Sequence, residues 1–147
     1  MCFALHGWPA LPEGVCGLVA GPCMAAFDNC RIRVVGRPGH GAMPHETVDP
    51  VVVASELVLS LQTVLSRNLN PLEPAVLTFG RITGGTAHNA VAAEVALEGT
   101  IRYFDEGIGR TLANCIRARA GGVAAAHGAT AEVEIEEGYP ATVNQPG

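Results

Sequence analysis

Arg31-Ile32-Arg33-Val34-Val35 alternates charged and aliphatic side chains, which predicts a half-buried β-strand. A loop rich in glycine and proline follows over residues 36–45. Asp49-Pro50 then supplies an N-cap and a first-turn proline for a helix that we expect to end near Arg67. The apolar residues of this helix recur at intervals of three and four: Ala54, Leu57, Val58, Leu61, Val64 and Leu65.

The same patterns continue toward the C-terminus. Strands are expected at 74–82 and 93–104, and Asp105 is a plausible N-cap for a second helix that stops at Gly128. A fourth strand follows at 131–136, with alternating apolar and acidic residues. The buried side of the second helix is expected to comprise Ile108, Leu112, Ile116, Ala120 and Val123.

The predicted order is β-α-β-β-α-β, which is typical of the ferredoxin-like arrangement. We therefore predict an α+β fold in which residues 29–137 form a four-stranded antiparallel sheet with two helices on one face. In the strand at 93–104 the aliphatic residues share one side and the charged residues the other, so the sheet should have one solvated face.

The two ends of the chain look different from this domain. Glycine and proline interrupt residues 1–24, which should hold one short strand at Cys2–Leu5 and at most one more around 17–20. Gly138-Tyr139-Pro140 ends the regular region, and residues 141–147 show no pattern.

Composition excludes several classes of protein. Hydrophobic residues make up 48% and charged residues 16% of 147 residues, the opposite of a disordered segment. A net charge of −5 argues against a nucleic-acid surface. The most apolar stretch, 50–65, is interrupted by polar residues, so we expect no membrane partner. Five cysteines without a C-x-x-C pair, and an N-terminus without a basic region, favour a reducing, cytoplasmic location.

Two histidines are candidates for chemistry. His6 ends the expected first strand, a place where α/β proteins put metal-binding or catalytic groups, although an ordinary partly buried histidine is the alternative. His40 lies between two glycines, and its imidazole could donate a hydrogen bond to a developing oxyanion. The alternative for His40 is a flexible turn with solvated histidines.

The remaining motifs do not indicate a functional site. The run 84–89 lacks the lysine of a phosphate-binding loop, and the outward carboxylates of the strands are typical of a solvated face. The sequence contains pieces of a site and no complete site.

Several motifs in one order resemble the hippurate hydrolase group of metal-dependent amidohydrolases. This group includes N-acyl-amino-acid hydrolases and belongs to the aminoacylase, carboxypeptidase G and desuccinylase superfamily. The matching motifs are His6-Gly7-Trp8-Pro9, residues 36–45, Asp49-Pro50, Ser66-Arg67, Gly84-Gly85, Asn89 and Gly99-Thr100-Ile101-Arg102.

The resemblance implies a domain assignment. Residues 29–137 match the lid or dimerisation domain, which has the same β-α-β-β-α-β order. Residues 1–28 would be a remnant of the metal-binding catalytic domain, and residues 138–147 the start of its return. The fragment would form a homodimer through the lid and would be inactive by itself.

The resemblance also implies roles for four residues. His6 matches a metal ligand of a site that takes two divalent ions, such as zinc, manganese or nickel, in the full enzyme; this fragment should hold none stably. His40 matches the lid histidine that stabilises the oxyanion in the partner subunit's active site. Asn89 and Arg102 match residues associated with the substrate's carboxylate and amide region.

Two hypotheses follow. The chain is part of an enzyme that hydrolyses the amide bond of N-acyl amino acids such as hippurate. Alternatively, it is a non-catalytic ferredoxin-like binding or regulatory dimerisation module. The fold alone does not separate them, because this fold carries many functions.

Overall fold

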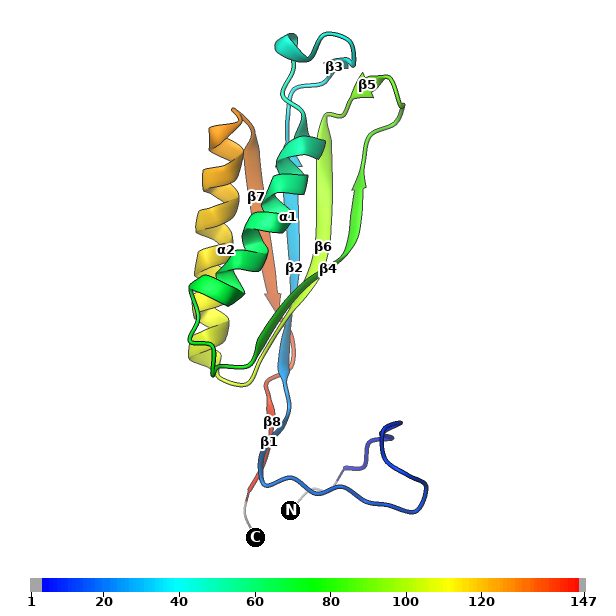
Figure 1. Ribbon diagram of the computed structural model, residues 1–147, viewed down its shortest axis with the longest axis vertical. Helices are drawn as coiled ribbons and strands as arrows, with labels where there is room; N and C mark the ends of the chain where they lie inside the picture. Colours follow the sequence, from blue (N-terminus) through cyan, green and yellow to red (C-terminus); the bar gives the residue numbers. More distant parts are fainter. Residues whose placement is uncertain (1–3, 146–147) are drawn as a thin grey trace.

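The computed structural model describes residues 4–145 and confirms the predicted α+β fold. A four-stranded antiparallel sheet in the order β4-β6-β2-β7 carries both helices on one face (Figure 1). α1 packs beside β4 and α2 beside β7. The elements of this domain are β2 (Ala26–Val35), α1 (Pro50–Arg67), β4 (Ala75–Gly84), β6 (Glu94–Tyr103), α2 (Glu106–Ala126) and β7 (Thr130–Glu137).

Two small sheets extend the domain at its two ends. At one end, β3 (Gly39–His40) pairs with β5 (Ala90–Val91), and a 3-10 turn, η1 (Pro44–Glu46), follows β3. At the other end, β1 (Gly21–Met24) pairs with β8 (Thr142–Asn144). Figure 1 shows the pair β3–β5 and the pair β1–β8 at opposite ends of the long axis. We call the first the tip and the second the connector.

The structure corrects the predictions for the chain ends. Ala4 and Leu5 are not in a strand, and the rest of the strand predicted at Cys2–Leu5 lies outside the described residues. The strand expected around 17–20 begins later, at Gly21, because residues 142–144 offer it a hydrogen-bonding partner there. The same pairing makes a strand of a segment that was predicted to have no pattern.

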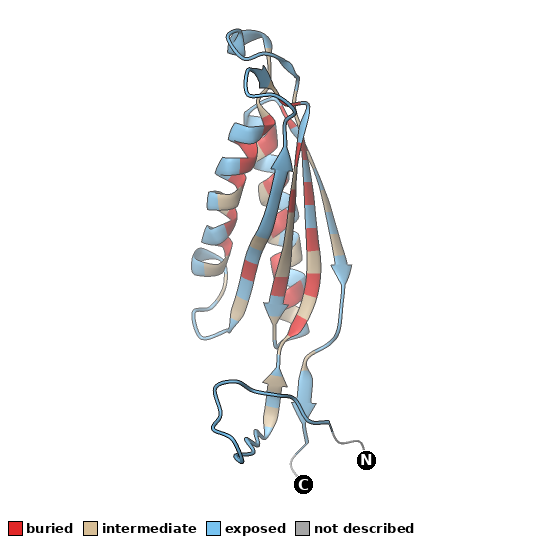
Figure 2. Cartoon of the chain, turned by 90° about the vertical axis from the view of Figure 1, so that its right-hand side faces the viewer, coloured by how far each residue is buried: buried red, intermediate tan, exposed pale blue. Residues whose placement is uncertain are grey.

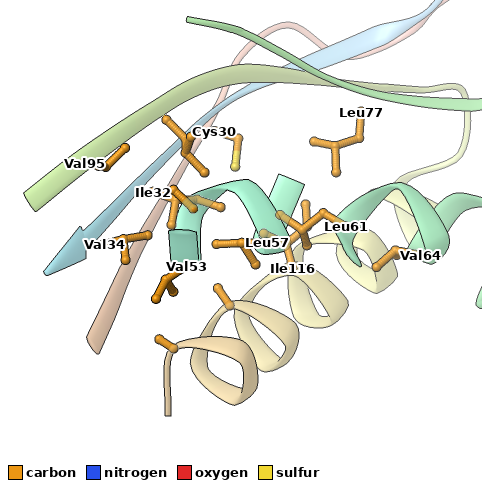
Figure 3. Close-up of a cluster of buried hydrophobic side chains, with 14 of the residues drawn as sticks. Cys30, Ile32, Val34, Val53, Leu57, Leu61, Val64, Leu77, Val95 and Ile116 are labelled. Carbon is orange, nitrogen blue, oxygen red and sulfur yellow. The ribbon is translucent and has the colours of Figure 1, made fainter. Parts of the chain in front are cut away.

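The core lies between the sheet and the two helices. Its largest buried side chains come from the sheet and from both helices, and those of the strands alternate along the chain as predicted (Figures 2 and 3). Burying each of these side chains stabilises the fold by about 1.5–3 kcal/mol. α1 has a mean hydropathy of 1.2 over 18 residues, enough by length and composition for a membrane span, yet its apolar stripe covers this sheet. The central residues are Ile32, Leu97, Ile101, Leu57, Leu61, Leu112 and Ile116.

The predicted helix ends are confirmed. The carboxylate of Asp49 accepts a hydrogen bond from the Val51 N–H at 2.9 Å, and that of Asp105 accepts one from the Ile108 N–H at 3.1 Å. Gly128 follows α2 with a φ of 71°, a conformation in which a side chain would be strained.

The opposite face of the sheet is solvated and charged, as predicted. One row of side chains crosses all four strands with alternating sign: Glu134, Arg31, Glu98 and Arg81. Arg33 binds Glu132 and Glu94 in the neighbouring row, each at 2.8 Å. Exposed pairs of this kind each contribute little to stability.

A buried carboxylate closes the domain beside the connector. Asp28 is 5% exposed, and its carboxylate accepts hydrogen bonds from the Tyr103 hydroxyl at 3.0 Å and from the Gly138 N–H at 3.3 Å. The interaction joins β2, β6 and the returning chain, so it fixes the point where the domain ends.

We predict that this interaction is visible in a phenol titration. Burial, followed by the hydrogen bond to Asp28, raises the pKa of Tyr103 to about 12. A phenol with a raised pKa stabilises the fold fully below its ordinary pKa of 10, and this contribution is lost as the pH rises through about 12. Ultraviolet titration in a Tyr139→Phe background follows Tyr103 alone.

Asp28→Asn in the same background should lower the midpoint, because the negative charge beside the hydroxyl is removed. A midpoint near 10 with the carboxylate present would contradict the prediction.

Candidate functional site

His40 projects from the tip, beyond the end of the central sheet. Its backbone pairs with Ala90, and the Gly41 N–H donates to the Asn89 carbonyl oxygen at 2.9 Å. A side chain at Gly41 would press on that carbonyl group, with its Cβ 2.8 Å from the oxygen. The structure therefore brings the backbone of Asn89 beside the loop that carries His40.

The loop that carries His40 is closed at its base. Arg37 and Val48 exchange backbone hydrogen bonds of 2.9 and 3.0 Å, and the Arg37 Nε donates to the Glu46 carbonyl oxygen. The loop is thus held at two places, where Arg37 pairs with Val48 and where β3 pairs with β5. His45, on the same loop, is exposed and lies 3.8 Å from Glu46.

The imidazole of His40 is arranged as a hydrogen-bond donor. Its Nδ1 accepts from the Ala42 N–H at 3.0 Å, so the neutral ring carries its proton on Nε2. The residue is exposed, which leaves the Nε2–H free to meet a group on another surface. A fixed N–H of this kind suits a carbonyl oxygen on which negative charge develops.

His6 has the opposite tautomer. Its Nδ1 lies 2.7 Å from the Gly7 carbonyl oxygen and must donate to it, so the lone pair is on Nε2. Histidines that bind metals commonly donate their other ring nitrogen to a backbone carbonyl in this way. His6 is exposed, outside any strand, and its ring packs edge-on to Trp8 at 6.0 Å.

The metal-binding side chains of residues 4–145 do not form a complete site. Among residues 4–145 no three His, Cys, Asp or Glu side chains gather into a group that could hold an ion. A metal site that included His6 would therefore need ligands from outside these residues.

Arg102 lies far from His40. It is opposite Phe27 and Val76 in the sheet, near the connector, whereas Glu94 begins the same strand near the tip. Eight residues of extended strand span about 26 Å. The structure therefore separates Arg102 from Asn89 and His40 and places it at the end from which the His6 segment emerges (Figure 1).

A shallow hollow beside the tip was not predicted from the sequence. It has a volume of about 450 Å³ and lies between the start of β3 and the loop after β4. Glycine and alanine predominate in its walls, and the small side chains around Gly85 are the one sequence signal that could have indicated it. Its apolar lining comprises Pro38, Gly39, Ala90, Val91, Ala92 and Ala93.

Comparison with known proteins identifies the domain. Residues 27–125 match the peptidase dimerisation domain of the M20 family. The chain belongs to this family. The resemblance read from the sequence motifs is thereby confirmed.

The curated relatives are amidohydrolases and deacetylases. The chain is 42% identical to an N-acyl-L-amino acid amidohydrolase of Geobacillus stearothermophilus over 95% of its own length and 38% of the relative's. It is 39% identical to an N-acetyl-L-cysteine deacetylase of Bacillus subtilis, over 95% of this chain and 34% of that protein. The chain thus spans little more than a third of the length of these relatives.

A solved structure gives the same family. The YXEP protein of Bacillus subtilis, described as a dinuclear metal-binding peptidase, superposes with a TM-score of 0.72 at 28% identity. The match covers 95% of this chain and 33% of the other. Binding of two metals is therefore described for a relative, and about two thirds of that relative's chain is not matched by this chain.

We predict that the two histidines show different neutral tautomers. Long-range ¹H–¹⁵N spectra of the ring nitrogens above the titration range should show Nε2–H for His40 and Nδ1–H for His6, because their Nδ1 atoms face an N–H and a carbonyl oxygen respectively. Ala42→Pro removes the donor and should remove the preference of His40 while leaving His6 unchanged. An Nδ1–H tautomer at His40 would refute the arrangement.

Proposed function

We propose that this chain is the lid and dimerisation part of a metal-dependent amidohydrolase that cleaves N-acyl amino acids, such as hippurate, into a carboxylate and an amino acid. The relatives named for this reaction support the class of substrate. The observation that carries the proposal is the free Nε2–H of His40, held on a closed loop in the tip, whereas the N-terminal segment leaves the domain at the opposite end (Figure 1).

Each of the two histidines would have one task. His6 would supply one ligand to a site for two divalent ions, such as zinc, manganese or nickel, whose other ligands lie outside this chain. When bound, those ions would supply Lewis acidity for attack of water on the amide. His40 would donate its Nε2–H to the amide oxygen as negative charge develops there, with no proton transferred.

The length of the domain supports a role for His40 in the active site of the partner subunit. β2 has ten residues, about 33 Å of extended strand, and it separates the tip from the connector. His6 and His40 of one copy therefore lie too far apart to serve one substrate. A two-fold dimer removes the conflict, because the tip of each copy can reach the other copy's site.

The same geometry divides the substrate-binding residues. Asn89 is tied to the His40 loop and would enter the partner's site with it. Arg102 stands at the connector and would bind the substrate's carboxylate in its own subunit's site, where a guanidinium can form two parallel hydrogen bonds.

Charge favours one edge of the sheet for dimer formation. The edge strand β7 carries Glu132, Glu134 and Glu136, all exposed, so a second copy would meet its own charge there. The other edge strand, β4, has Arg81 as its one charged residue. We therefore infer that the dimer forms through β4 and the adjacent helix α1.

The exposed apolar residues support this choice. Val51 is 47% exposed on α1, and Ile82 is 57% exposed on β4. Val51 lies on the side of α1 away from Ser60 and Thr63, which bind α2. Ile82 is opposite Leu97 in the sheet and so shares the helix-bearing face. A partner that extends the sheet past β4 would cover both.

The hollow beside the tip fits an apolar acyl group. Its walls are mostly small and aliphatic, with Thr86 and Glu94 as the polar lining residues, and His40 adjoins it through Gly39 and Ala90. A benzoyl or acetyl group has the apolar character that this lining suits.

The location that we propose for the protein is the cytoplasm, because the described cysteines are free thiols.

We predict that Val51→Glu produces a monomer. The substitution places a charge within the proposed interface, and sedimentation equilibrium should show a dimer for the unmodified chain and a monomer for the variant. Val19→Glu is the matched control, because Val19 is 55% exposed in the N-terminal segment and its substitution should leave the dimer intact. A monomeric unmodified chain, or a dimeric Val51→Glu, would refute the interface.

A complementation experiment tests catalysis across the dimer. The chain is grafted into the Geobacillus stearothermophilus amidohydrolase in place of its matching segment. His40→Ala and His6→Ala should each abolish hydrolysis of N-acyl amino acids. When the two variants are mixed and reassembled, half of the dimers should contain one copy of each. Such a mixed dimer has one site with both histidines and one site with neither. The mixture should therefore recover about a quarter of the activity.

Two outcomes would contradict the proposal. Recovery of no activity in verified mixed dimers would place His40 in its own subunit's site. An active His40→Ala graft would deny His40 a role in the reaction and favour the non-catalytic dimerisation module.

A further inference from the structure

Arg102 differs from the other arginines of the solvated face. Arg31, Arg33 and Arg81 each face a glutamate. The Arg102 guanidinium instead lies over the ring of Phe27, with its central carbon 4.8 Å from the ring centroid. Within residues 4–145 it forms no ion pair, so its N–H groups are free for a ligand.

Phe27 is itself held on both sides. Its N–H donates to the Tyr139 carbonyl oxygen at 3.1 Å, and its carbonyl oxygen accepts from the Gly138 N–H at 3.0 Å. The rings of Phe27 and Tyr139 lie 5.5 Å apart at an angle of 56°. A side chain at Gly138 would meet the Phe27 ring, with its Cβ 2.8 Å from ring carbons.

We propose that Phe27 is a positioning residue that presents Arg102 to the carboxylate of the substrate. The inference rests on the proposed carboxylate-binding role of Arg102. An aromatic face attracts the guanidinium while leaving its edge, where the N–H donors are, open for a carboxylate. An arginine ordered before the substrate arrives loses less conformational entropy on binding.

The arrangement also links Arg102 to the connector. Gly138 and Tyr139 belong to the chain that returns from the domain. The Gly138 N–H, beside the Phe27 ring, also donates a hydrogen bond to the Asp28 carboxylate. The position of the guanidinium is thus set by the same residues that fix the end of the domain.

The test uses the grafted enzyme with two substrates, an N-benzoyl amino acid and its amide, which lacks the carboxylate. Phe27→Leu should raise KM about threefold to fivefold for the acid, the size of an exposed cation–π interaction, and leave kcat unchanged. KM for the amide should not change. Phe27→Tyr keeps an aromatic face and should restore the KM of the acid.

Arg102→Ala separates the inference from the function on which it rests. If Arg102→Ala raises KM for the acid and Phe27→Leu does not, Phe27 has no positioning role. If Arg102→Ala raises KM equally for the acid and the amide, Arg102 does not bind the carboxylate, and the proposed role on which the inference rests is wrong.

A second measurement needs no activity. In the 147-residue chain, the side-chain protons of Arg102 should be shifted upfield by the Phe27 ring current, and the shift should disappear in Phe27→Leu. Unshifted protons in the unmodified chain would overturn the inference.

Discussion

The packing of both helices on one face of the four-stranded sheet is the constraint on which the rest of the structure depends. A strand of ten residues is covered along its length by α1 and α2, so the domain is long and narrow and its loops gather at the two ends (Figure 2). Every candidate functional residue lies at one of these ends. The distance between them is therefore fixed by the hydrophobic core and not by the site.

The large elements were predictable because their signals are local. Alternation in Arg31–Val35, caps at Asp49 and Asp105, and periodic aliphatic residues in the helices each act within a few residues of the chain. The small sheets were not. β3 and β5 have two residues each and are about fifty positions apart, so their pairing depends on where β2 and β6 end. β1 and β8 pair over more than a hundred positions.

The candidate site was likewise predictable from the sequence only in part. Motif order identified His6 and His40, yet their opposite tautomers depend on a single backbone group beside each ring, the Gly7 carbonyl and the Ala42 N–H. Asn89 and Arg102 are thirteen residues apart in the sequence, which suggests proximity. The intervening residues form a strand along the whole sheet, so the two lie at opposite ends.

The proposed dimer would bring the two ends of the domain together. If β4 pairs antiparallel with its copy, a two-fold axis through that edge inverts the second copy, so the tip of one subunit would lie toward the connector of the other. Arg102 lies beside the connector, and the segment with His6 precedes it. Each proposed site would then combine His6 and Arg102 of one chain with the partner subunit's His40 and Asn89. Pairing through the acidic edge of β7 would oppose three glutamates to their copies, which is why the charge distribution and the proposed catalytic arrangement select the same edge.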